Sequence, residues 1–290
     1  MPKSTQNFLK FTTQTAIKAG KIVMKDFGKE TKVEAKGIRD IVTKYDRASE
    51  NFIKKEILKK FPNHEFLGEE SGKSKPKQAN TNSKIHQSRT GKSSTKASDT
   101  YMWIVDPIDG TKNFARKIPL FAVSIALYKN GKPLIGVVHN PVLQETFWAE
   151  KGKGAFKSSP WQKTHRIKTS KTTKLVDAIL VTGFHPQSTR KNLPIFAHLA
   201  AKSFGMRRTG SASIDLCYTA SGLFDGFWEF DLKPWDIAAG VLILQEAGGK
   251  ATNFDGSPLD FKLKQFLGTN GLLHKTLSKE ISIALKKGFK

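Results

Sequence analysis

Residues 103–114 read WIVDPIDGTKNF and place two aspartates, Asp106 and Asp109, three positions apart on one tight turn. The residues before the first aspartate are apolar, which is typical of a buried strand, and the proline and glycine that follow favour a turn. An isolated motif of this kind is usually a turn whose carboxylates accept backbone N–H groups. The other interpretation is a site for a hard cation such as Mg²⁺, because the Ile108 carbonyl and the Thr111 hydroxyl add oxygen ligands at the same point.

Further carboxylates occur at the ends of other predicted elements. Glu69 and Glu70 lie in GEESG, after a short predicted strand, and Asp236 lies in KPWD, before an apolar predicted helix. Asp46 precedes a helix predicted to run to about Phe61, where it could be the N-cap. Each residue alone has an ordinary interpretation, as a solvated surface pair or a helix cap. Together, without a His or Cys cluster at metal-ligand spacing, they favour Mg²⁺ over zinc and metal-assisted chemistry on a phosphate ester.

Other motifs narrow the chemistry. The chain has no Gly-x-x-x-x-Gly-Lys-Ser/Thr loop and no Gly-x-Ser-x-Gly elbow, so the sequence does not indicate a P-loop nucleotidase or an α/β-hydrolase. Arg207 and Arg208 precede Gly-Ser-Ala-Ser and a predicted helix. A guanidinium and a helix N-terminus can both hold an anion, although a solvated basic strand end fits the same residues.

Composition predicts a globular protein without a membrane segment. The 290 residues include 38% hydrophobic residues, and no apolar run is long enough to cross a bilayer. The first twenty residues contain no continuous apolar stretch of the kind that a secretory signal has. With Cys217 as the single cysteine, we expect no internal disulfide and a cytoplasmic location.

The charge balance is unusual, since 49 Lys and Arg residues against 25 acidic residues give a formal net charge of +24. Such a surface attracts RNA, anionic membranes or phosphorylated ligands without specificity. General basicity of the parent proteome and an RNA or transcription-complex partner both account for it. Within a single predicted domain, 1–290, residues 73–100 hold seven basic residues and one acid, which predicts a disordered surface insertion; a nucleic-acid-binding arm is the alternative.

The order of the remaining elements indicates layers of mixed helix and sheet instead of a regular βαβ winding. Strand-like segments dominate the chain from Trp103 to Phe156, and Lys-Asn-Gly-Lys at 129–132 predicts a hairpin turn. Helices are then predicted from about 194 to 204, over 213–222, over 235–249 and at the basic C-terminus.

Three of these motifs, GEES, WIVDPIDGTKNF and WDIAAGVLILQEAGG, follow one another as the signature segments of the inositol monophosphatase family do. The chain resembles this family over nearly its whole length, outside 73–100 and the extreme termini. The likeness is strongest to the bacterial inositol-1-monophosphatases that also act in transcription antitermination. The resemblance implies an α+β fold, a five-layer αβαβα sandwich, usually a homodimer, and Mg²⁺-dependent hydrolysis of a phosphorylated small molecule.

The resemblance also assigns roles by motif. It implies that two Mg²⁺ ions are held by Glu69, Asp106, the Ile108 carbonyl, Asp109 and Asp236. It implies that Asp106 bridges these ions, and that a weaker third ion uses Glu70 and Asp46. Glu69 and Thr111 would orient the attacking water. Substrate contacts are implied for Ile108, Asp109, Gly110, Thr111, Arg207, Ala212, Glu229 and Asp236.

One departure from the pattern concerns the substrate. Lys112 follows Thr111, where many inositol phosphatases have a second threonine. A lysine there also occurs in relatives that act on histidinol phosphate or adenosine 3′,5′-bisphosphate. Inositol-1-phosphate is therefore the first hypothesis, with those two esters or a sugar phosphate as alternatives and an RNA-binding role as the alternative from another class. Sensitivity to lithium is also implied by the resemblance.

Overall fold

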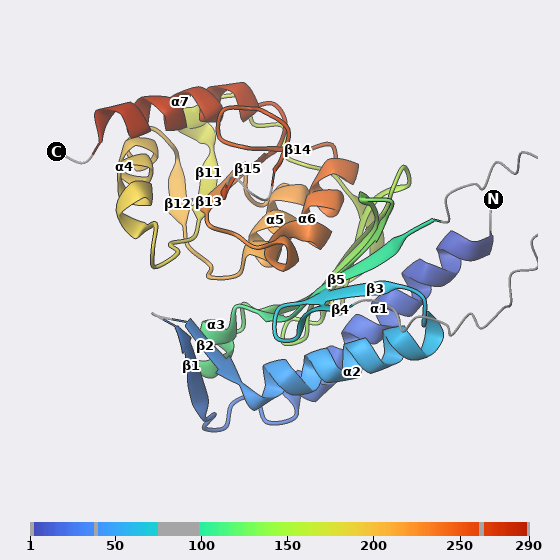
Figure 1. Cartoon of the computed structure of the whole chain (residues 1–290). Helices are drawn as coiled ribbons and strands as arrows, with labels where there is room; N and C mark the ends of the chain where they lie inside the picture. Colours follow the sequence, from blue (N-terminus) through green and yellow to red (C-terminus); the bar gives the residue numbers. More distant parts are fainter. Residues whose placement is uncertain (1–2, 38–39, 75–98, 261–263, 289–290) are drawn as a thin grey trace, which may run out of the picture.

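Helices and β-sheets alternate in five layers, as Figure 1 shows. In this computed structural model, residues 3–37, 40–74, 99–260 and 264–288 are described. Two helices cover one face of a large sheet, two helices fill the space between that sheet and a smaller one, and two more cover the outer face of the smaller sheet. The predicted αβαβα sandwich is confirmed.

The larger sheet has eight strands, and its central strands are apolar on both faces because helices cover both. The pair β3 and β5 is parallel, whereas the other neighbours are antiparallel. In spatial order the strands are β10 (Gln162–Ile167), β9 (Gly154–Ser159), β8 (Glu145–Glu150), β7 (Lys132–Asn140), β6 (Ala122–Lys129), β5 (Tyr101–Asp109), β3 (Glu65–Gly68) and β4 (Gly72–Ser74).

The smaller sheet has five strands and mixed direction. In spatial order they are β12 (Gly205–Arg207), β11 (Ile179–Thr182), β13 (Gly226–Phe230), β15 (Gln265–Thr269) and β14 (Lys250–Thr252). A 3₁₀ turn, Leu175–Asp177, precedes β11. A separate antiparallel hairpin is formed by β1 (Val33–Gly37) and β2 (Asp40–Thr43).

The first outer layer consists of α1 (Lys3–Met24) and α2 (Lys44–Lys60). Both helices pack against the larger sheet and bury one apolar face each. Ala16 and Ala19 of α1 and Ile53 and Ile57 of α2 meet the sheet around Trp103. The apolar spacing of three and four residues explains why these helices lie flat on the strands.

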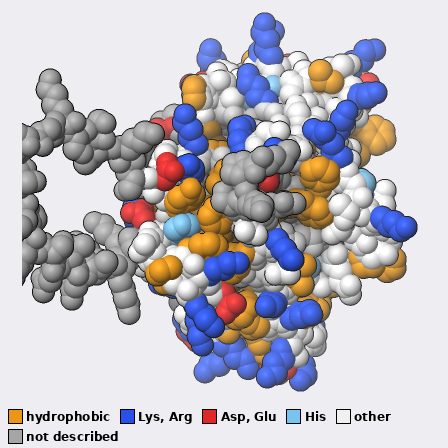
Figure 2. Space-filling view, turned by 90° about the vertical axis from the view of Figure 1, so that its right-hand side faces the viewer, with side chains coloured by type: hydrophobic (Ala, Val, Ile, Leu, Met, Phe, Trp, Pro, Cys, Tyr) orange, Lys and Arg blue, Asp and Glu red, His pale blue; other side chains and the backbone are white. Residues whose placement is uncertain are grey.

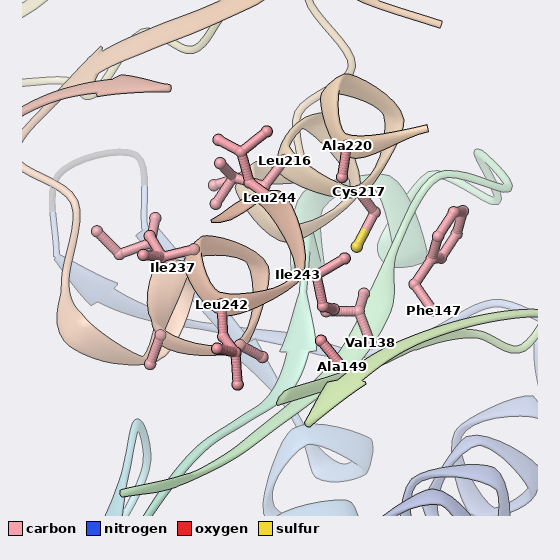
Figure 3. Packing of buried hydrophobic residues seen from close by; sticks show 14 of the residues in the cluster. Val138, Phe147, Ala149, Leu216, Cys217, Ala220, Ile237, Leu242, Ile243 and Leu244 are labelled. Carbon is pink, nitrogen blue, oxygen red and sulfur yellow. The ribbon is translucent and has the colours of Figure 1, made fainter. Parts of the chain in front are cut away.

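The central layer consists of α5 (Ala212–Ala220) and α6 (Pro234–Glu246). Every residue of α6 from Ile237 to Leu244 is buried, which is expected of a helix with sheets on both sides. In Figure 3, Cys217 of α5 and Ile243 of α6 lie above Val138 and Ala149 of the larger sheet. The largest apolar cluster therefore joins the two sheets through these helices.

The last layer consists of α4 (Thr189–Ala200) and α7 (His274–Lys287), which pack on each other and on the smaller sheet. The sequence pattern predicted this helix from about Pro194 to Phe204. That start is wrong, since the helix begins at Thr189 and contains Pro194 internally.

Two more local expectations need correction. The predicted insertion, 73–100, begins too early, because Lys73 and Ser74 belong to β4 and pair with β3; its residues 75–98 lie outside the described part of the chain. Asp46 is not the N-cap of α2: Thr43 is, and Asp46 is the third helical residue of a capping box. Among the residues that the structure describes, no helix is long and apolar enough to cross a membrane.

Candidate active site

The carboxyl ends of β3 and β5 meet at one edge of the larger sheet because the two strands are parallel. The backbone N–H of Glu69 donates to the Val105 carbonyl at 3.2 Å. This contact places Glu69 beside Asp106, the next residue along β5. The structure therefore brings together two of the predicted acidic motifs that lie far apart in sequence.

The turn that ends β5 is held by its own side chains and by a glycine. Asp106 accepts the backbone N–H of Ile108 at 3.0 Å, and the pairing of β5 with β6 shifts register between Asp106 and Asp109. Gly110 has φ 96° and caps α3 (Thr111–Ala115). A Cβ there would lie 3.1 Å from the Leu120 carbonyl, so both the backbone conformation and the space require glycine.

Thr111 joins this turn to α2. Its hydroxyl lies 2.9 Å from Asp46 Oδ1 and 3.0 Å from the Ile108 carbonyl, and donates to these acceptors. The other oxygen of Asp46 accepts both the backbone N–H and the hydroxyl of Thr43. Asp46 is completely buried and fixes the orientation of Thr111.

Asp109 connects the same turn to α5. Its Oδ2 atom accepts the Ser211 hydroxyl at 2.7 Å and the Ser213 backbone N–H at 2.6 Å. The sequence suggested that the N-terminus of α5 could hold an anion, and the structure places the carboxylate of Asp109 there. Charge at this helix end is stabilised by the free N–H groups of the first turn.

The remaining acidic residues come from the β3–β4 turn and from α6. Asp236 is the third residue of α6 and accepts the Lys233 backbone N–H at 2.6 Å, so it is not the N-cap that its position in sequence suggested. Lys36, on β1, places its ammonium 3.1 Å from Glu69 Oε1 and also contacts Glu70. Although burial works against it, the two carboxylates raise the pKa of Lys36.

Four carboxylates, those of Glu69, Asp106, Asp109 and Asp236, influence one another electrostatically. Burial and the negative charges of the other three raise the pKa of Asp106 well above its ordinary value. Burial, followed by the charge of Asp109, does the same to Asp236. Burial also raises the pKa of Asp109 and, against the opposing effect of Lys36, raises that of Glu69 to about 7. Such a cluster favours the binding of positive charge.

The donor chemistry fits a hard cation. The side-chain atoms that could bind an ion are all carboxylate oxygens, which hard cations prefer. The Lys36 ammonium already places one positive charge beside Glu69 and Glu70. However, no three His, Cys, Asp or Glu side chains of the described residues are arranged round one point so as to hold an ion. The carboxylates instead accept the protein hydrogen bonds described above. The potential ligands are therefore gathered at one site but do not yet form a coordination shell.

Two adjoining cavities open onto this cluster. The smaller, of about 170 Å³, is lined by Ile108, Gly110, Thr111 and the four carboxylates, together with Ile41, Lys112 and Gly210. The larger, of about 280 Å³, shares Glu69, Asp109 and Asp236 with it and extends past Ala212 and Glu229. All the predicted metal and substrate residues named in this paragraph therefore lie on one continuous surface.

Three predicted residues lie apart from the cavity walls. Arg207 is exposed on β12, with its guanidinium donating to the Met206 carbonyl, and the adjacent Arg208 lines the larger cavity instead. Glu70 and Asp46 line neither cavity but contact residues that do, through Lys36 and Thr111. The sequence did not predict Lys36 as a site residue, because an exposed strand lysine has no motif of its own. It did not single out Arg208 as the cavity residue, because the sequence alone does not show which of two adjacent arginines faces the cavity.

The chain matches the model of the inositol monophosphatase family over residues 4–286. It is 36% identical to the fructose-1,6-bisphosphatase/inositol-1-monophosphatase of Aquifex aeolicus, over 94% of each chain, and 39% identical to the inositol-1-monophosphatase of Rhizobium meliloti, over 86% of each. The structure of extragenic suppressor protein suhB from Bartonella henselae superposes with a TM-score of 0.83 and 35% identity, covering 98% of this chain and all of that one. The fold, the acidic turn and these likenesses agree: the chain belongs to the inositol monophosphatase family and is a phosphatase.

Proposed function

We propose that the protein is a Mg²⁺-dependent phosphate monoester hydrolase whose preferred substrate is inositol-1-phosphate. The observation that carries this proposal is the cluster of four mutually repelling carboxylates beside a cavity that also presents Gly110 and Thr111. When bound, two or three Mg²⁺ ions would neutralise this cluster, lower the pKa of a water molecule and polarise the phosphoryl group. The holding residues would be Glu69, Asp106, the Ile108 carbonyl, Asp109 and Asp236, with Glu70 and Asp46 at a weaker position.

The chain's own groups suit in-line attack by water. Thr111 donates its hydroxyl hydrogen within the protein, so its oxygen lone pairs are available to orient a water molecule. Glu69 lies on the same cavity wall and would accept the proton that the water molecule loses. The water oxygen would bond to phosphorus while the bond from phosphorus to the ester oxygen of the substrate breaks. That oxygen would take up a proton from a solvent water as the alcohol leaves.

The larger cavity provides the space for the leaving group. Asp236 lies in the wall of both cavities and so between the phosphate and the rest of the substrate. Glu229 and Ala212 line only the larger one and would contact the sugar ring. Burial raises the pKa of Glu229 well above its ordinary value. A protonated Glu229 could donate one hydrogen bond to a hydroxyl and accept another, which suits a polyol.

A second substrate class is favoured by the rim of the larger cavity. Lys112, Arg208 and Lys233 are exposed there and would attract a second phosphate. Sugar bisphosphates and adenosine 3′,5′-bisphosphate are therefore the favoured alternatives, and two of the relatives are named for activity on fructose-1,6-bisphosphate as well as inositol-1-phosphate. Histidinol phosphate has a single phosphate, so it stays an alternative through the resemblance at Lys112 and not through the basic rim.

The test is phosphate release from inositol-1-phosphate, histidinol phosphate, adenosine 3′,5′-bisphosphate and fructose-1,6-bisphosphate, each with Mg²⁺ and with a chelator. We expect release that requires Mg²⁺ and a higher kcat/KM for inositol-1-phosphate. A higher kcat/KM for another ester would keep the chemistry and change the substrate. Release that is unaffected by chelation would contradict the role given to the carboxylates.

A candidate function of another class is binding to RNA or to a transcription complex. The net charge of +24 favours it, and Figure 2 shows Lys and Arg side chains spread over the upper, right and lower parts of one face. Such binding weakens steeply with salt when it rests on charge alone. Retention of RNA at physiological ionic strength would support this function, and complete release there would argue against it.

The same proposal includes a homodimer and inhibition by lithium, which the family resemblance implies, and a cytoplasmic location, which the single cysteine and the first twenty residues predict. Light scattering of the purified chain measures the first directly, and a mass of one 32.2 kDa chain would contradict it. Phosphate release at increasing Li⁺, with K⁺ at equal ionic strength as the control, measures the third.

A further inference from the structure

One face of α2 contacts each of the loops that carry the acidic residues. Asp46, Ser49, Glu50 and Lys54 recur along it at helical spacing. Asp46 accepts from Thr111, and the Ser49 hydroxyl donates to the Pro107 carbonyl at 3.2 Å. These two contacts hold the turn at the end of β5.

Glu50 holds the other acidic loop, the turn between β3 and β4. Its Oε2 accepts the backbone N–H of Glu70 at 2.8 Å, and its Oε1 accepts that of Ser71 at 2.7 Å. Lys54, one turn further along, donates to the Ser71 hydroxyl at 3.0 Å. Glu50 is only 2% exposed although it is a carboxylate, so its two oxygens are committed to this turn.

The chain leaves room for this carboxylate at Gly68, the residue before the acidic pair. A Cβ at Gly68 would lie 2.5 Å from Glu50 Oε2. The turn and the Glu50 carboxylate therefore pack directly against each other. Glu50 contacts the backbone before Glu69, at Gly68, and the backbone after it, at Glu70 and Ser71.

We infer that Glu50 is a positioning residue: it holds the Glu69–Glu70 turn in the orientation needed to bind the divalent cation, without touching the cation or the substrate. The inference rests on the proposed function, because it assigns a cation to these carboxylates. Charged acceptors make the stronger hydrogen bonds to N–H groups, and here each oxygen serves a different N–H. Groups that orient metal-binding residues are worth about 10–100-fold in metal affinity.

The central variant is Glu50→Gln. Its shape is unchanged, but one end of the amide is an NH₂ group that would face a backbone N–H, so one of the two hydrogen bonds is lost. The matched control is Glu56→Gln, which removes the same charge from another face of the same helix, six positions after Glu50. Gly68→Ala is a second variant that keeps every charge and displaces the Glu50 carboxylate.

The first measurement is binding of Mn²⁺, counted by the electron paramagnetic resonance signal of the free ion, in the absence of substrate. We expect Glu50→Gln and Gly68→Ala to weaken Mn²⁺ binding by about tenfold, with Glu56→Gln unchanged. The second measurement is phosphate release against Mg²⁺ concentration. Both variants should need about tenfold more Mg²⁺, with kcat at saturating Mg²⁺ within about twofold of the parent.

Unchanged Mn²⁺ binding in Glu50→Gln or Gly68→Ala, with the fold verified by circular dichroism, would overturn the inference. A fall in kcat at saturating Mg²⁺ with no change in Mn²⁺ binding would overturn it too, because that result assigns Glu50 to the chemistry. Failure of the proposed function looks different, since the parent protein itself would then bind no Mn²⁺ and release no phosphate.

Discussion

Asp109 is the residue at which two distant parts of the chain meet. It ends a strand of the larger sheet and accepts two hydrogen bonds from the first turn of α5, more than a hundred positions further along. The same carboxylate lines both cavities. Replacing this carboxylate by an amide would remove its charge and keep the oxygen that accepts these hydrogen bonds.

Asp109→Asn should abolish most of the phosphate release while leaving the fold in place. The amide oxygen can still accept from Ser211 and Ser213, but the negative charge is gone, and we expect at least about a hundredfold lower kcat/KM in Mg²⁺. The measurement is phosphate release from inositol-1-phosphate, with thermal unfolding as the check on folding. Asp255→Asn, at an exposed aspartate that lines neither cavity, is the charge-matched control and should be silent.

Lys36→Met should lower the Mg²⁺ concentration needed for half-maximal phosphate release, by several-fold on ordinary Coulomb grounds. The ammonium group contacts Glu69 and Glu70, so it competes with a divalent ion for the same carboxylates. Lys32→Met, on the exposed segment just before β1, is the control. A higher Mg²⁺ requirement in Lys36→Met would show that the lysine assists the site.

At the scale of elements, the β6–β7 hairpin shows how a short motif fixes two strands. Asn130 and Gly131 have φ 52° and 73°, as the tight turn predicted from Lys-Asn-Gly-Lys requires. The Asn130 side chain also accepts the backbone N–H of Thr100 at 2.8 Å, which ties the turn to the start of β5. The hairpin thus aligns the strand that carries the acidic turn.

Gly131→Val should lower the free energy of unfolding by about 1–2 kcal/mol, because a branched residue is strained at positive φ. No atom lies near the missing Cβ, so the loss comes from the backbone alone. Gly131→Asn, which tolerates this conformation, should cost less than half as much. Urea denaturation measures both, and equal losses would contradict the explanation by backbone strain.

The same scale shows what a motif can and cannot predict. The hairpin, α5 and α6 follow from local patterns, and the structure confirms them. Asp46 and Asp236 were each predicted as possible N-caps, yet both are third residues, because the cap positions of Thr43 and Lys233 depend on how the chain enters the helix. The helix α4 also begins before the predicted start at about Pro194, because tertiary packing outweighs the usual exclusion of proline from a helix interior.

At the scale of the whole molecule, the meeting of the acidic motifs depended on strand order. Parallel pairing of β3 with β5 places Glu69 beside Asp106, and no local pattern encodes that pairing. Lys36 reaches the site through a separate hairpin, and Glu50 reaches it from a helix face, so neither has a signature in sequence. Resemblance to the inositol monophosphatase family assigned the roles that residue spacing alone left open. The contacts of Lys36 and Glu50 depend on the tertiary structure.

Buried histidines make the stability of the whole molecule depend on pH. Burial lowers the pKa of His139 to about 4 in the folded chain, against about 6.5 when unfolded. Between these pH values the unfolded chain binds more protons at His139 than the folded chain does. The contribution of the neutral, buried His139 to the free energy of unfolding is therefore complete above about pH 6.5 and is lost as the pH falls toward 4. It amounts to about 3 kcal/mol.

His139→Gln should therefore flatten the fall in the free energy of unfolding between pH 6.5 and pH 4.5, even if it lowers stability at neutral pH. Urea denaturation at a series of pH values measures the slope. His165→Gln, at a partly exposed histidine of β10, is the comparison and should keep the parent slope. The same slope in His139→Gln as in the parent would assign the acid sensitivity to other groups.

The position of α6 between the sheets also has a consequence for synthesis. The strands of the larger sheet leave the ribosome well before α6, the helix that covers their inner face. At about 5–20 residues per second, that face stays uncovered for several seconds. During that interval Val138, Phe147 and their neighbours are open to contact with other nascent chains. Slow translation between β10 and α6 would thus favour aggregation, and a chaperone that binds apolar strands would act in that window.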